Sequence, residues 1–96
     1  MAAKHGHEQA AIFWAENKLH GWGVDQDFFA AMDMFWQLRH NSQALFNLGI
    51  GYEAMAKQDS YSQRQYLQIA KKCLEKASAL GSSNATDYLQ EFNKKW

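Results

Sequence analysis

The chain has 96 residues, which is enough for one compact domain or a short stack of repeats. Hydrophobic residues make up 47% of it and charged residues 21%, a composition that excludes a disordered tail. Ten basic and ten acidic residues give a formal net charge of zero, so no overall field attracts nucleic acid or an anionic membrane. We therefore expect neither as a partner.

Cys73 is the single cysteine, so the chain cannot form an internal disulfide or a four-cysteine zinc site. The longest apolar run, residues 10–15, is far shorter than the roughly 20 residues that cross a bilayer. These features predict a cytoplasmic protein, or a periplasmic one if a leader has been removed.

Apolar residues recur at intervals of three and four residues in five segments, and no segment alternates convincingly with a period of two. The predicted helices cover residues 7–20, 27–39, 42–55, 60–80 and 84–96. Side chains suited to capping stand near four of the starts, namely Asp27, Ser42, Ser60 and Asn84, and Gln63 completes a capping box with Ser60. Gly81 is expected to end the fourth helix in a left-handed conformation.

An internal repeat underlies this pattern. Ala10, Trp14 and Ala15 correspond, 34 residues later, to Ala44, Leu48 and Gly49. The junction around Gly6 matches the junction around Gly81, and the helix starting near Asn84 places Gln90 and Asn93 where the second repeat has Gly49 and Tyr52. We expect one domain, 1–96, with repeats at 7–40 and 42–80, an insertion at 56–62 and a terminal helix at 83–96.

The repeat carries a recognisable motif. The first copy has Gly21-x-Gly23-Val24-x-x-Asp27 with Ala31 and Phe35, and the second has Ala44, Leu48-Gly49 and Tyr52. The chain resembles the Sel-one-like repeat family, a branch of the tetratricopeptide-like helical solenoids, over nearly its whole length. The resemblance implies an all-α fold, an α-α superhelix of about two helix pairs plus a C-terminal capping helix. Trp14, Ala15 and Lys18 depart from the motif.

Most of the motif positions are explained by packing. Small residues allow close helix approach and large ones fill the layers between helices; the small set is Ala31, Ala44, Gly49, Ala70 and Ala85. Cys73 lies in an apolar stripe and is expected to be buried rather than nucleophilic. His5 and His7 occupy a predicted turn whose other copy is residues 80–82, so the repeat explains their position without a metal. His20 and His40 lack a carboxylate cluster at ligand spacing. We predict no metal, no cofactor and no catalytic residue.

One helix face remains as a candidate partner site. Phe13, Glu16, Asn17 and His20 recur at i, i+3, i+4 and i+7, and Asn47 and Ile50 are the second-repeat equivalents of Phe13 and Glu16. The resemblance implies that the first helix of each pair lines a concave face, so these six residues are predicted to bind a protein or peptide. Trp22, Trp96 and the insertion at 56–62 are alternative anchors.

The predicted function is that of a non-enzymatic interaction module or adaptor, monomeric or weakly dimeric. The alternative is a dedicated inhibitor, regulator or immunity-type protein that binds one specific enzyme or toxin. A hydrolase is the third and least favoured class, because the chain lacks both the Ser-x-x-Lys pattern and a G-x-S-x-G elbow.

Overall fold

The computed structural model describes residues 2–20 and 28–96, with the backbone alone described for residues 2–6 and 20. Five α-helices occupy these ranges: α1 (Ala2–His20), α2 (Phe28–Gln37), α3 (Ser42–Gln58), α4 (Gln63–Ala79) and α5 (Ser83–Lys95). Neither range contains a strand, so the predicted all-α class is confirmed. The predicted glycine loop, including Gly21, Trp22 and Asp27, lies outside the described residues.

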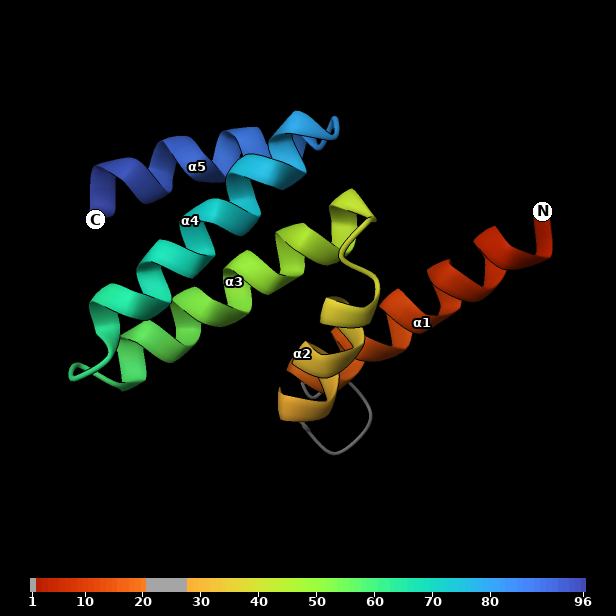
Figure 1. The fold of residues 1–96 in the computed structure, drawn as a ribbon, viewed down its shortest axis with the longest axis horizontal. Coiled ribbons are helices and arrows are strands. Elements are labelled where there is room, and N and C mark those ends of the chain that lie inside the picture. The colour runs from red at the N-terminus through yellow and green to blue at the C-terminus, as the bar shows by residue number, and fades with distance from the viewer. Residues whose placement is uncertain (1, 21–27) are drawn as a thin grey trace.

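Helices that follow one another in the chain pack against one another. α3 and α4 lie side by side and run in opposite directions, with α5 folded back along α4 (Figure 1). α1 and α2 form a second pair on the other side of α3, and both of them contact it. α3 is therefore the central helix. Within the described ranges, no helix is both long and apolar enough to span a bilayer.

The core lies where these helices meet. The largest fully buried side chains are Ile12 on α1, Phe35 on α2, Leu48 on α3 and Leu74 on α4. The five small residues predicted to allow close packing are all buried. At Gly49 the approach of α3 and α4 is close, because an added Cβ would stand 2.6 Å from Leu74 Cγ and 3.3 Å from the Ala70 carbonyl oxygen. α3 and α4 thus meet at a glycine that leaves no room for a side chain.

α1 begins earlier than predicted. The prediction placed a turn at Gly6 by analogy with Gly81, but α1 runs without interruption from Ala2 through Gly6. Gly81 does adopt a left-handed φ of 104° and follows the end of α4. A glycine inside a helix costs only about 1 kcal/mol, and alanine, the best helix former, stands at positions 2 and 3. The analogy between the two glycines is therefore wrong at the level of the backbone.

Two predicted caps lie near the true ones. Asn41, rather than Ser42, caps α3, since its Oδ1 accepts from the backbone N–H of Gln43 at 2.8 Å. Ser82, rather than Asn84, caps α5, and its Oγ accepts from the Ala85 N–H at 3.1 Å. Serine and asparagine are nearly equal as caps, so residue type alone cannot choose between neighbours.

The capping box predicted at Ser60 and Gln63 is absent from the start of α4. Instead, Asp59 Oδ1 accepts from the backbone N–H groups of Tyr61 at 3.1 Å and Ser62 at 3.3 Å. Gln63 Nε2 donates to the Ala56 carbonyl at 3.2 Å. The turn between α3 and α4 is thus closed by an aspartate at its beginning, and the first three residues of the predicted insertion continue α3.

Candidate protein-interaction site

The six predicted partner residues have very different environments. Phe13 is 65% exposed, whereas Asn47 is 4% exposed. Asn17 and Ile50 are half-buried, and the side chain of His20 lies outside the described residues. The structure therefore does not present these six residues as one open wall.

Glu16 holds two helices together. Its Oε2 accepts from Asn47 Nδ2 at 2.8 Å and from Gln43 Nε2 at 3.0 Å. Asn47 Nδ2 also lies 3.0 Å from the Gln43 carbonyl oxygen. The partly buried Glu16 carboxylate therefore links α1 to α3.

A second carboxylate links α3 to α5. Glu53 is 4% exposed, and it accepts hydrogen bonds from the Tyr88 hydroxyl and, at 2.8 Å, from Trp96 Nε1. Burial raises the pKa of this carboxyl. The two donors and the ammonium groups of Lys57 and Lys95 together lower the pKa by more than burial raises it, so the net shift is downward. The buried Glu53 is therefore an anion held by two hydrogen-bond donors.

The donors of the two carboxylate contacts occupy corresponding positions in the predicted repeat, whereas the two glutamates do not. Asn47 follows Ala44 by three residues, and Tyr88 follows the matching Ala85 by three residues. Each of these donors reaches back to a glutamate on the previous first helix, Asn47 to Glu16 and Tyr88 to Glu53. Sequence reasoning missed Glu53, although a carboxylate among the apolar residues of α3 was a visible signal.

α3 has two packing faces. Its upstream face, which packs on α1 and α2, consists of Ala44, Asn47, Leu48 and Gly51. Its downstream face packs on α4 and α5 through Phe46, Gly49 and Glu53. In α5 the residues matching the upstream face also pack inward, since Ala85 and Phe92 are buried and Tyr88 and Leu89 are half-buried.

The matching upstream face of α1 is open. Its residues are Ala10, Phe13, Trp14 and Asn17. Phe13 is 65% exposed and Trp14 is 43% exposed, with Lys18 Nζ 5.7 Å from the centre of the Trp14 ring. By contrast, the downstream residues Ile12, Ala15 and Leu19 are buried against the rest of the molecule. α1 therefore exposes the face that α3 and α5 use for packing.

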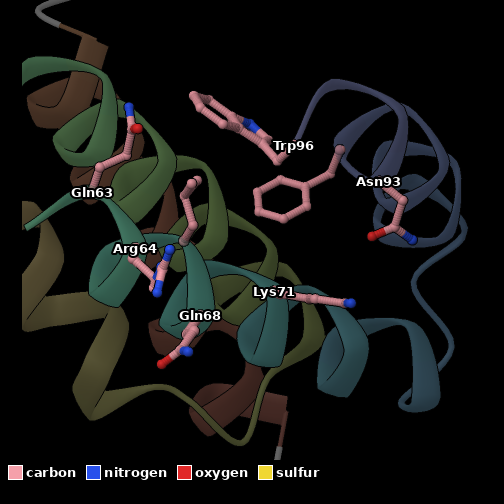
Figure 2. A pocket seen from close by; sticks show the side chains of 8 residues that line it. Gln63, Arg64, Gln68, Lys71, Asn93 and Trp96 are labelled. Atoms are coloured by element: carbon pink, nitrogen blue, oxygen red, sulfur yellow. The ribbon is translucent and has the colours of Figure 1, made fainter. Parts of the chain in front are cut away.

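A groove opens between α4 and α5, with a volume of about 410 Å³ (Figure 2). We call it the α4–α5 groove, and its lining residues are Gln63, Arg64, Leu67, Gln68, Lys71, Phe92, Asn93 and Trp96. The picture shows Arg64, Gln68 and Lys71 along α4, with Trp96 and Asn93 opposite them on α5. Of these residues, only Trp96 was predicted from the sequence as a possible anchor for a partner.

Across residues 2–20 and 28–96, no group of three or more His, Cys, Asp or Glu side chains is placed to hold a metal ion. His40 pairs with Glu8 at the surface. Cys73 is buried, and burial raises the pKa of its thiol to about 11, which disfavours the nucleophilic thiolate. The burial predicted for Cys73 is confirmed.

Searches of protein-family models, curated proteins and solved structures find no match to this chain.

Proposed function

We propose that this protein is a non-enzymatic interaction module built from Sel-one-like repeats, a short right-handed solenoid that presents a helical face to another protein. The observation that carries the proposal is the open upstream face of α1, with Phe13 and Trp14 exposed. The matching positions of Asn47 and Tyr88, each of which donates to a glutamate on an earlier helix, support a stack of repeats. In such a stack each unit buries its face only against its neighbours.

The two ends of the stack differ in character. At the α5 end, the positions matching the downstream face of α3 are Asp87, Gln90 and Lys94, all exposed and polar. A polar outer face is what a terminal capping helix requires for solubility. At the α1 end, the outer face is the upstream face of α1, where Phe13 and Trp14 are exposed. Apolar patches of this kind mark sites of protein association.

The chemistry of the α1 face suits a protein helix. On α3 the same face packs on α2, and Met32 of α2 lies directly over Gly51. A Cβ added at Gly51 would stand 2.3 Å from Met32 Sδ. A partner helix with a methionine or leucine stripe would pack on Phe13 and Trp14 in a similar way. Large aromatic anchors supply most of the energy in such interfaces.

The test is a comparison of two double variants in affinity capture from the source cells. Phe13→Ala with Trp14→Ala should abolish capture of the partners that the wild-type protein retains. Phe29→Ala with Tyr61→Ala is the matched control, because these aromatic residues are 76% and 99% exposed but lie off the α1 face. Equal capture by both variants would refute the proposed face. A single tightly bound enzyme among the partners would identify the protein as a dedicated inhibitor.

A further inference from the structure

We propose that the α4–α5 groove binds an acidic peptide segment that carries one bulky apolar side chain. The groove lies on the far side of α3 from α1, so this surface is separate from the helix-binding face described above (Figure 1). Its occupant is inferred from the apolar floor, the uncompensated positive charge and the amide groups at the rim.

The floor of the groove is apolar and rigid. Leu67 comes from α4, while Phe92 and Trp96 come from α5 with ring centres 6.5 Å apart. The Trp96 indole is fixed by its hydrogen bond to Glu53, yet it remains 42% exposed. An aromatic side chain that is already held in place loses little conformational entropy on binding. The floor can therefore receive an apolar side chain at low cost.

The charged residues that line the groove are both cations. Arg64 and Lys71 line the groove, and none of the eight lining residues is acidic. Both cations are exposed, and no ion pair joins either of them to another residue within the part of the chain that the structure describes. They stand seven residues apart on α4, a separation of about 10 Å along the helix axis. This spacing suits two carboxylates on either side of an anchor residue.

Charges of both signs lie near Trp96. Lys95 Nζ lies 5.7 Å from the centre of the Trp96 ring, and Glu53 accepts the indole N–H. The side-chain contact with Lys57 and its charge lower the pKa of Lys95, whereas the charge of Glu53 raises it. Glu91 on the same helix is already within 3.9 Å of Lys94. These groups lie outside the lining of the groove, so the positive charge of the groove rests on Arg64 and Lys71.

The rim distinguishes a peptide from a simple anion. Gln68 and Asn93 place amide groups on opposite sides of the groove, and both residues are exposed (Figure 2). Side-chain amides offer both a donor and an acceptor, which match the N–H and C=O groups of a peptide backbone. The volume of about 410 Å³ accommodates a side chain with part of its backbone.

The experiment is a selection of displayed random peptides on the full chain. The wild-type protein should enrich peptides in which aspartate or glutamate flanks a phenylalanine, tryptophan or leucine. A synthetic peptide of the enriched sequence should bind about tenfold more weakly to Arg64→Glu with Lys71→Glu, a loss of about 1.4 kcal/mol. It should also bind more weakly to Trp96→Ala and at high salt.

The matched control is Lys72→Glu with Lys76→Glu, which makes the same charge change on the same helix outside the groove. This variant should keep most of the affinity, and circular dichroism should show that both double variants remain folded. Enrichment of neutral or basic peptides, failure to enrich any peptide, or equal loss in the control would overturn the proposal. The α1 variants leave the groove intact, so the two proposals can fail separately.

Discussion

At the scale of single residues, the most informative side chain is Glu53. It is a buried carboxylate whose partners, Tyr88 and Trp96, both come from α5. A buried charge is tolerated only when hydrogen bonds replace its hydration, and here both donors belong to the terminal helix. Glu53 therefore fixes the position of α5 on α3 and orients one wall of the α4–α5 groove.

The pH dependence of stability follows from this contact. The pKa of Glu53 is lowered from its usual value of 4.5, so its stabilising contribution is present above pH 4.5 and is lost as the pH falls through the folded-state pKa. Glu53→Gln should lower the free energy of unfolding by about 1–3 kcal/mol at neutral pH, because one donor loses its acceptor. Denaturant titrations across the acid range should show this difference shrinking as the pH falls.

The control for this prediction is Glu91→Gln, which neutralises an exposed carboxylate on α5. It should change stability by less than about 0.5 kcal/mol at any of these pH values. A constant difference between Glu53→Gln and the wild type down to low pH would show that Glu53 is not an anion in the folded protein.

Cys73 gives a second prediction. Its side chain is buried, and its pKa is raised to about 11 by burial. Because the folded-state pKa lies above the usual 9.0, the contribution of the protonated thiol to stability is fully present below pH 9. This contribution is lost as the pH rises through about 11. A thiol reagent should label the native protein far more slowly than the protein unfolded in denaturant. Rapid labelling of the native protein would contradict the observed packing.

At the scale of helices, periodicity identified all five segments, because the apolar stripe of each one faces a neighbour. The ends were harder to predict. α1 continues through Gly6, and Asn41 and Ser82 cap α3 and α5 in place of nearby polar residues. The position at which a helix begins or ends depends on its packing against neighbouring helices. Residue type alone does not determine that position.

The candidate site was predicted less well than the helices, for a related reason. Phe13 and Asn47 were predicted to share a repeat position, yet one is exposed and the other is buried. Asn47 is buried because its face of α3 packs on α1 and α2. Phe13 is exposed because the matching face of α1 is open. The α4–α5 groove depends on how two helices lie together, and no spacing within either helix reveals that.

The close approach at Gly49 gives a prediction for α3 and α4. An alanine there would gain about 1 kcal/mol in helix propensity, but its Cβ would stand 2.6 Å from Cγ of the fully buried Leu74. Gly49→Ala should therefore destabilise the protein by about 1–3 kcal/mol in thermal or denaturant unfolding.

A double variant tests the cause. Leu74→Ala alone should cost about 2–5 kcal/mol by leaving a cavity, and the cost of adding Gly49→Ala to it should be much smaller than in the wild type. Additive losses would show that the clash is not the source of the destabilisation.

At the scale of the whole molecule, the described helices form a sequence with unequal ends. α5 exposes Asp87, Gln90 and Lys94, whereas α1 exposes Phe13 and Trp14. The two exposed faces therefore differ in polarity, since that of α5 is polar and that of α1 is aromatic. The two proposed binding surfaces then differ in kind: a helix would extend the stack at α1, and a peptide would enter a groove between α4 and α5.

The packing of each helix against the next one in the chain has a consequence for the speed of folding. Chains dominated by contacts between near neighbours in sequence reach the native state quickly, because little loop-closure entropy is lost before contacts form. The sequence also contains no proline, which removes the slow isomerisation of unfolded chains. Stopped-flow refolding from denaturant should therefore be complete within about a second, without a slow phase. A phase lasting tens of seconds would point to association between chains as the slow step.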